Sequence, residues 1–122
     1  MNAIPVEIKL RKASRLIAMQ FDDGTSFELP FEYLRVFSPS AEVQGHGPGQ
    51  GVLQTGKENT GVTSIEPIGN YAVRLVFDDG HDTGLYTWNY LYELGAKQAE
   101  NWQAYLDRLT SEGHVRQDLV IN

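Results

Sequence analysis

The amino-acid sequence predicts an α+β domain in which two related β-hairpin units form a small, mostly antiparallel sheet or pair of sheets, with a short helical turn and two C-terminal helices. Three observations predict this class. Apolar and polar residues alternate along several short segments, which is the period of a half-buried strand. The triplet Asp-Asp-Gly occurs twice between such segments, and Asp-Gly favours the tight turn of a hairpin. The last third of the chain carries the apolar stripe of an amphipathic helix.

The first half of the chain predicts one hairpin unit. Apolar and polar residues alternate over 4–10 and again over 15–21. After the first Asp-Asp-Gly turn, residues 25–29 return as a short strand. Pro30 then opens one helical turn through residue 37, because proline suits the first helical position.

Residues 38–60 break this pattern. Five glycines fall in this polar segment. They predict a long mobile loop, and a loop of this length in a compact domain is commonly functional or disordered. We therefore expect the loop to take part in partner binding, with Gly47 and Gly49 among the residues involved.

The second half of the chain predicts a second hairpin unit and two helices. Residues 61–69 and 71–77 read as strands, and the second Asp-Asp-Gly turn leads into 81–86. The first helix is expected to end at Gly95, and the second to run over about 96–110.

The second helix carries the amphipathic stripe. Its apolar residues recur at i, i+3, i+4 and i+7: Trp102, Tyr105, Leu106 and Leu109. Residues 111–122 are expected to form a frayed tail. The chain of 122 residues is thus predicted to be one domain, residues 1–122, with its core over about 8–95.

The two hairpin units form an internal repeat. Phe-Asp-Asp-Gly at residues 21–24 matches the same residues at 77–80, and the apolar positions before them match as well. Because an aspartate before glycine can bond its own turn backbone, the triplet is assigned to the shared structure. The turn residues are Asp23, Gly24, Asp79 and Gly80. The repeat does not explain His81, which stands where the first copy has Thr25.

The composition excludes several classes of function. The chain has no cysteine, so disulfides, thiolate nucleophiles and cysteine metal sites are excluded. Its formal net charge of −6 argues against a nucleic-acid surface, which needs a basic patch. No apolar stretch approaches the roughly 18 residues of a membrane span, and the first residues lack a signal-peptide pattern. We therefore expect a cytoplasmic protein with neither a nucleic-acid nor a membrane partner.

Three functional motifs fail on their details. Residues 51–58 approach the phosphate-loop pattern, but Glu58 replaces the hydroxyl that holds magnesium. No serine has the elbow setting of a nucleophilic triad, so hydrolase chemistry is rejected. A non-haem iron site needs His-x-Asp/Glu, whereas Asp82 directly follows His81 and points to the opposite face of a strand. The chain is therefore predicted not to be an enzyme.

The order of these segments resembles the gamma-butyrobetaine hydroxylase-like N-terminal domain family. The stretch DGHDTGLYTWNYL at 79–91 is the most specific part of the resemblance, which covers about residues 8–95 and is strongest for compact stand-alone bacterial members. In the hydroxylase this domain precedes a separate iron- and 2-oxoglutarate-dependent catalytic domain and is not itself catalytic. Similar domains are appended to iron–sulfur cluster carrier ATPases.

The resemblance also implies a zinc site of three cysteines and one histidine. On this sequence the cysteine positions fall on Ser38, Ser40 and Val43, and the histidine falls on His81. Three of the four ligands are therefore missing, because serine hydroxyls are poor zinc ligands beside thiolates and valine offers no donor.

Two functions remain open from the sequence. The first is a non-catalytic accessory or protein-interaction domain, linked by the resemblance to iron or iron–sulfur processes and expected to hold no cofactor. Its unidentified protein partner is expected to contact the 38–60 loop and exposed aromatics, above all Tyr90 and Tyr105. The alternative is an iron- or zinc-binding protein that uses His81 with His46 and nearby carboxylates such as Asp82.

Overall fold

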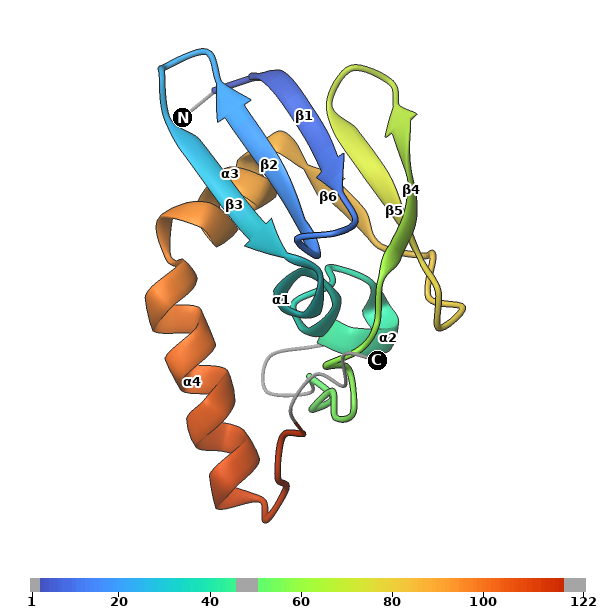
Figure 1. Cartoon of the computed structure of the whole chain (residues 1–122), viewed down its shortest axis with the longest axis vertical. Helices are drawn as coiled ribbons and strands as arrows, with labels where there is room; N and C mark the ends of the chain where they lie inside the picture. The colour runs from blue at the N-terminus through green and yellow to red at the C-terminus, as the bar shows by residue number, and fades with distance from the viewer. Residues whose placement is uncertain (1–2, 46–50, 118–122) are drawn as a thin grey trace.

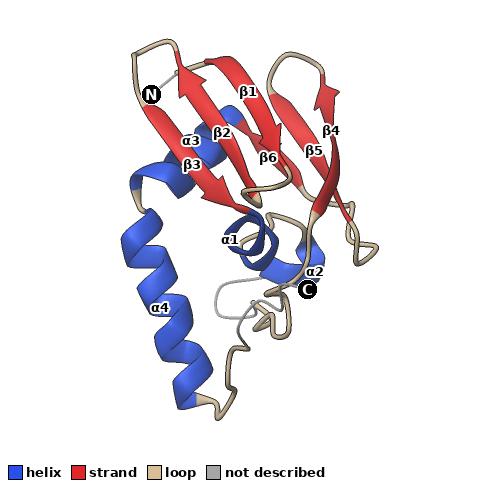
Figure 2. Ribbon diagram, in the orientation of Figure 1, coloured by secondary structure: helices blue, strands red, loops and turns tan. Residues whose placement is uncertain are grey.

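The computed structural model describes residues 3–45 and 51–117. Its strands are β1 (Pro5–Arg11), β2 (Leu16–Phe21), β3 (Ser26–Pro30), β4 (Val62–Ile68), β5 (Ala72–Phe77) and β6 (Leu85–Thr87). Its helices are α1 (Phe31–Val36), α2 (Ala41–Gln44), α3 (Trp88–Ala96) and α4 (Gln98–Ser111). Figure 2 shows the strands gathered at one end of the molecule and α4 extending from them. The predicted α+β class is confirmed.

The strands form two three-stranded antiparallel sheets, in the orders β1-β2-β3 and β4-β5-β6 (Figure 1). Their registers coincide, since Ile8 lies opposite Met19 in one sheet and Ile65 lies opposite Leu75 in the other. An irregularity in the pairing also falls near the start of both β1 and β4. The repeat seen in the sequence is therefore a repeat of backbone structure.

Each Asp-Asp-Gly triplet closes its hairpin with the same hydrogen bonds. In the second copy the Phe77 N–H donates to the His81 carbonyl at 3.0 Å, and the His81 N–H donates to Asp79 Oδ1 at 3.1 Å. The first copy makes both bonds between the equivalent residues of its own turn. Gly24 and Gly80 have φ of 85° and 90°, in the left-handed region that favours glycine.

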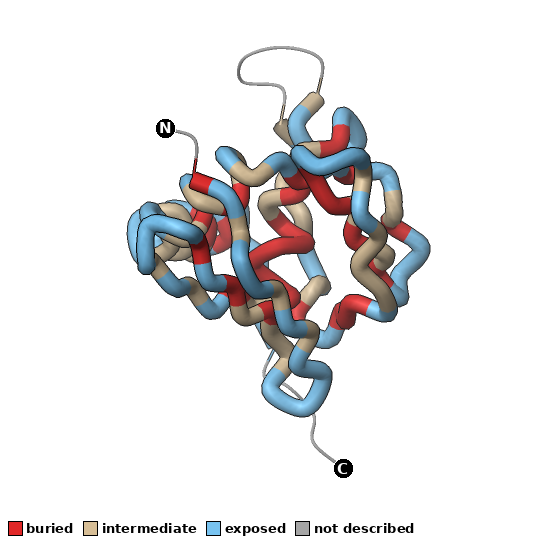
Figure 3. The backbone as a smooth tube through the Cα atoms, turned by 90° about the horizontal axis from the view of Figure 1, so that it is seen from above, coloured by how far each residue is buried: buried red, intermediate tan, exposed pale blue. Residues whose placement is uncertain are grey.

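The main core lies between the two sheets (Figure 3). Alternate residues of a strand point to one face, so Ile17 and Met19 of β2 and Val73 and Leu75 of β5 point inward. A small apolar void of about 10 Å³ is lined by both sheets and two helices. The side chains around it are Ile8, Ile17, Met19, Leu29, Leu34, Ile65, Val73, Leu75 and Leu91.

The two units also contact each other reciprocally. The Tyr33 hydroxyl of α1 donates to the Leu94 carbonyl of α3 at 2.7 Å. The Tyr90 hydroxyl, at the equivalent position of α3, donates to the Phe37 carbonyl at the end of α1 at 2.5 Å. Helix α1 of one unit is thus bonded to helix α3 of the other by a matched pair of tyrosines.

Helix α3 continues past Gly95, where the sequence predicted its end, and stops at Ala96. The following helix accordingly covers Gln98–Ser111 rather than 96–110. Gly95 serves a close approach instead of a helix end, because a Cβ there would lie 2.3 Å from Cγ of Phe27. Pro30 occupies the N-cap position of α1, one residue before the position predicted for it.

The segment between the two units is packed over its described parts, 38–45 and 51–60. It forms α2 and places Ser38, Val43 and Glu58 in buried positions. The segment therefore contains a short helix and buried residues that the sequence did not predict. Its mobility stays a prediction, and 46–50 lie outside the described residues.

The described part of the C-terminal segment also contacts the domain. Ser111 is the last residue of α4, and Arg116 pairs with Glu32 of α1. The predicted frayed tail thus does not begin at 111, and residues 118–122 lie outside the described part of the chain. Within 3–45 and 51–117, none of the helices is both long and apolar enough to cross a membrane.

Candidate functional site

The structure places His81 in a buried hydrogen-bonded cluster between the second Asp-Asp-Gly turn and α2. His81 is only 5% exposed. Its Nε2 lies 2.7 Å from Ser38 Oγ, and its Nδ1 lies 3.2 Å from Glu42 Oε2. The Ser40 N–H donates to Ser38 Oγ at 3.2 Å. These contacts fit a neutral imidazole whose Nδ1–H donates to Glu42 and whose Nε2 accepts from the Ser38 hydroxyl.

Burial lowers the pKa of His81 below its usual value, and the positive charge of Arg35 lowers it further. The Glu42 carboxylate acts in the opposite direction but does not outweigh these two effects. His81 is therefore neutral at pH 7, as the tautomer assignment requires.

The turn that carries His81 is held by a half-buried ion pair. Arg35 of α1 donates from Nε to Asp79 Oδ2 at 2.9 Å, and Lys57 donates to the same oxygen at 3.1 Å. Burial by itself raises the pKa of Asp79, but the hydrogen bonds from the His81 N–H, Arg35 and Lys57 outweigh it and lower the pKa. This ion-pair network thus joins three segments of the chain: Arg35 lies on α1, Lys57 on the loop and Asp79 on the turn.

The first unit contains the counterpart of this ion pair. There Asp23 Oδ2 accepts from the Tyr92 hydroxyl of α3 at 2.8 Å. Tyr92 stands at the position of α3 that matches Arg35 of α1. In both units the second aspartate therefore bonds its own turn and the helix of the other unit, and a catalytic role is not needed to account for it.

Two of the three positions that the family resemblance assigns to zinc-binding cysteines, Ser38 and Ser40, lie beside His81. Ser38 contacts His81 directly, Ser40 is two residues further on, and Val43 is buried on α2. The Ser40 hydroxyl is bonded to Thr83 Oγ1 at 2.7 Å and accepts from the Glu42 N–H. Two neutral hydroxyls, one valine and one histidine do not fit a zinc ion, which prefers thiolate and imidazole donors. Among the described residues, no three metal-ligating side chains form a cluster.

The order Ser38–His81–Glu42 also matches the hydrogen-bond sequence of a nucleophilic triad. Sequence reasoning missed this arrangement, because α2 and its Glu42 were not predicted. Ser38, however, is 0% exposed. Gly84 lies so close above it that a Cβ at 84 would be 2.5 Å from Ser38 Oγ. No substrate carbonyl can reach the hydroxyl in this structure. Ser38 and His81 therefore act as a polar part of the core, whereas the Glu42 side chain is 65% exposed.

The remaining predicted metal residues do not join this cluster. Asp82 lies 3.9 Å from Arg74 on β5, whereas the His81 ring contacts α2 and the segment before it. His46 lies outside the described residues, as do Gly47 and Gly49. The pairing of His81 with Asp82 is thus not seen, and the participation of His46 stays a prediction.

The two tyrosines expected at the surface point inward. Tyr105 is buried and its hydroxyl donates to the Gln54 carbonyl at 2.7 Å, while Tyr90 bonds the Phe37 carbonyl. Burial raises the pKa of each hydroxyl to about 12. The expectation of a surface position is therefore wrong for Tyr105, whereas Tyr90 is half-buried and keeps part of its side chain at the surface. The hydroxyl of each tyrosine bonds a backbone carbonyl.

These features define a class of small α+β domain built from two hairpin–helix units that exchange contacts. The family model described as "Gamma-butyrobetaine hydroxylase-like, N-terminal" matches residues 8–92. The chain belongs to this family. The resemblance drawn from the sequence is thereby confirmed.

Solved structures agree with this assignment. One protein with an NMR solution structure is 49% identical, with a TM-score of 0.81, and the match covers 98% of this chain and 96% of that one. A second NMR structure is 47% identical, with a TM-score of 0.82, and the match covers 99% and 92%. A protein of unknown function in the DUF971 family from Acidithiobacillus ferrooxidans is 41% identical, with a TM-score of 0.63, over 75% of this chain and 92% of its own. No curated protein matches this chain significantly.

Proposed function

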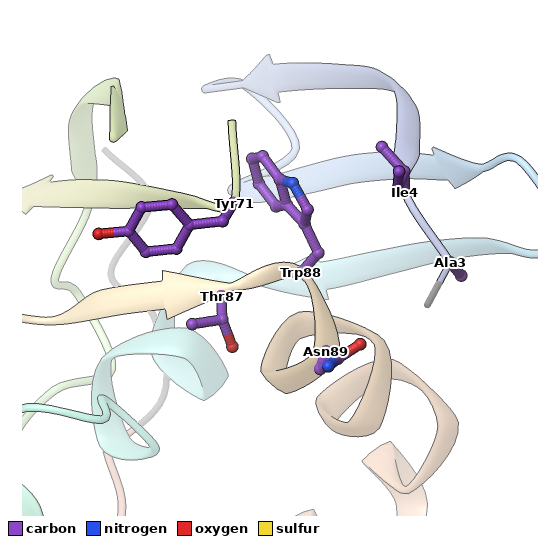
Figure 4. Close-up of a pocket in the computed structure, with 6 residues that line it drawn as sticks. All are labelled: Ala3, Ile4, Tyr71, Thr87, Trp88 and Asn89. Carbon is purple, nitrogen blue, oxygen red and sulfur yellow. The ribbon is translucent and has the colours of Figure 1, made fainter. Parts of the chain in front are cut away.

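We propose that this chain is a non-catalytic protein-interaction domain whose partner binds an exposed groove at the start of β1 and of α3. The groove encloses about 330 Å³ (Figure 4). Its lining residues are Ala3, Ile4, Tyr71, Thr87, Trp88 and Asn89. We call it the Tyr71–Trp88 groove.

The exposure of large apolar side chains in this groove carries the proposal. Tyr71 is 53% exposed and Ile4 is 52% exposed, although both are residues that folding normally buries at least in part. Tyrosine and tryptophan are also the residues most enriched at the energetic centres of protein interfaces. The groove presents Tyr71 and Ile4 to solvent beside the half-buried Trp88, an arrangement that suits a protein-binding surface.

The groove is also preorganised for binding. The Trp88 indole N–H donates to the Asn70 carbonyl at 2.7 Å, and the Trp88 backbone N–H donates to the Tyr71 carbonyl at 3.1 Å. The indole therefore has little freedom left to lose when a partner binds, which favours affinity.

The other unit provides a covered version of the same surface. Arg15 stands at the position equivalent to Tyr71, and Phe31 at the position equivalent to Trp88. Arg15 donates to the Thr60 carbonyl at 2.9 Å and lies 5.8 Å from the centre of the Phe31 ring, which is buried. In the first unit, Arg15 and the segment around Thr60 thus cover this surface. We propose that a partner covers the equivalent Tyr71–Trp88 groove of the second unit. The link to iron or iron–sulfur processes, which the family resemblance implies, stays a prediction.

Site-specific photocrosslinking in host cells tests this proposal. A photoreactive phenylalanine analogue is introduced at Tyr71 and, as a control, at Val52, an equally exposed apolar position on the loop. We expect a protein adduct from position 71 that Ile4→Asp removes, and no adduct from position 52. Adducts from position 52 alone, or adducts from 71 that persist in the Ile4→Asp variant, would refute the groove as the interface.

A further inference from the structure

Helix α4 and the segment after it lie beyond the part of the chain that the family model matches. The match ends at residue 92, within α3, and Lys97 alone joins α3 to α4, which begins at Gln98. We call the surface that α4 covers the α1 face. It is formed by the side chains of Tyr33, Val36, Phe37 and Leu53, from α1, its C-cap and the loop, and by the Gln54 carbonyl.

The apolar side of α4 fills this face. The stripe predicted from the sequence, at positions 102, 105, 106 and 109, packs against the α1 face in a second apolar cluster beside the main core. Tyr105 and Leu109 are buried there together with Val36. The ring of Trp102 stands edge-on to Tyr33, with the ring centres 6.2 Å apart.

Polar contacts set the register of the docked helix. Asn101 Nδ2 donates to the Tyr33 hydroxyl at 3.0 Å, and the Tyr105 hydroxyl donates to the Gln54 carbonyl. Arg108 Nη2 donates to the Gly51 carbonyl at 3.2 Å. The contact is thus a specific docking of one helix face, as in helix-in-groove recognition.

The segment after α4 adds an arginine clamp. Arg116 donates from Nε to Glu32 Oε2 at 2.8 Å and from Nη2 to Glu32 Oε1 at 2.5 Å. Its guanidinium also lies 5.6 Å from the centre of the Trp102 ring. The neighbouring Glu58 carboxylate accepts the Gln117 backbone N–H at 2.7 Å. Both glutamates are buried, and a buried carboxylate is costly unless it is paired.

We propose that the α1 face is a docking site for an amphipathic helix followed by an arginine, that α4 and Arg116 fill it within the same chain, and that a partner protein's helix of the same chemistry displaces them. The buried pair Glu32 and Glu58 selects the arginine by charge, and the apolar face selects the helix. Because the helix is tethered by a single residue, its high effective concentration makes it a built-in competitor. This site is distinct from the Tyr71–Trp88 groove.

A peptide in trans tests the proposal on the whole chain. The probe is a fluorescein-labelled peptide with the sequence of residues 98–117. In the double variant Leu109→Asp/Arg116→Gln, the tethered helix is weakened while the α1 face keeps its own residues. We expect this opened variant to bind the peptide at least about tenfold more tightly than the wild type does.

Matched variants define the specificity. Ala104→Asp changes the exposed side of α4, so it should bind the peptide no better than the wild type. Adding Glu32→Gln to the opened variant should weaken binding by about tenfold or more, because it removes one partner of a buried charge pair. Equal binding by the wild type and the opened variant, or binding unchanged by Glu32→Gln, overturns the proposal.

Hydrogen exchange on the wild type keeps the test decisive if the opened variant does not fold. A detachable helix predicts that α4 amides exchange through a local opening, with protection at least about tenfold lower than that of β2 and β5. Exchange of α4 only with global unfolding overturns the proposal. Concentration-dependent dimerisation that Arg116→Gln abolishes would assign the face to a second copy of this chain, and likewise overturns it.

Discussion

Replacement of Gly95 by alanine should destabilise the protein, although intrinsic helix propensity predicts the opposite. Alanine favours a helix over glycine by up to about 1 kcal/mol. In this structure, however, a Cβ at residue 95 would lie 2.3–2.5 Å from three atoms of the Phe27 ring, whereas ordinary contacts are 3.4–4 Å. The ring must therefore move by about 1 Å.

The Phe27 ring is half-buried, and two aromatic neighbours restrict this movement. It packs edge-on against Phe21 and Tyr92, with ring centres 5.9 and 5.3 Å away. Overpacking of this kind costs about 1–3 kcal/mol. After the gain in propensity is subtracted, we expect Gly95→Ala to lower the free energy of unfolding by up to about 2 kcal/mol.

Urea denaturation of four proteins measures this effect: the wild type, Gly95→Ala, Phe27→Ala and the double variant. With the ring removed, only the propensity gain remains, so Gly95→Ala should stabilise the Phe27→Ala background by up to about 1 kcal/mol. The effect of Gly95→Ala on the free energy of unfolding thus changes sign when the Phe27 ring is removed, with a coupling energy of about 1–3 kcal/mol. Stabilisation in both backgrounds, or equal destabilisation in both, would show that the Phe27 contact does not explain the glycine.

Three further predictions concern the buried cluster. A fluorophosphonate probe should leave Ser38 unlabelled in the native protein, as judged by peptide mass spectrometry, and labelling at Ser38 would show that the triad-like arrangement is accessible. Folding lowers the pKa of His81, so the unfolded state takes up the proton before the folded state does as the pH falls. The stability that depends on the neutral His81 imidazole is therefore present above pH ~6.5 and is lost as the pH falls below it. The free energy of unfolding should therefore fall more steeply below that pH in the wild type than in His81→Gln, by at most about 1.4 kcal/mol per pH unit, and parallel curves would contradict this. Titration with Zn²⁺ or Fe²⁺ should leave the NMR signals of the His81 ring unshifted, whereas shifts at sub-millimolar metal that also involve His46 would support the metal-binding alternative.

The internal repeat could be predicted because its evidence is local. Strand alternation needs only neighbouring residues, and the Asp-Asp-Gly turn depends on the backbone freedom of Gly24 and Gly80 and on side chains two residues from their acceptors. The register of each sheet then follows from its turn and its apolar face. The same local patterns located the amphipathic helix, since its stripe has the helical period.

The buried cluster could not be predicted in the same way. Glu42 and His81 are far apart in the sequence, and α2 is too short to show a period. Arginine is a residue type that is usually exposed on a helix, yet Arg35 is buried and bonded to Asp79 of the other unit. The family resemblance placed Ser38 near His81, but nothing in the residues said that the pair would be fully enclosed.

The sequence by itself determined the two hairpin units, their turns, the amphipathic helix and the family. Only the tertiary structure decided that Gly95 accommodates Phe27, that His81 is a satisfied core residue, and that Tyr105 is buried while Tyr71 is exposed. The reason is physical. Local patterns report which side of a strand or helix is apolar, whereas burial, hydrogen-bond partners and exposure at the ends of elements depend on how the two units pack on each other.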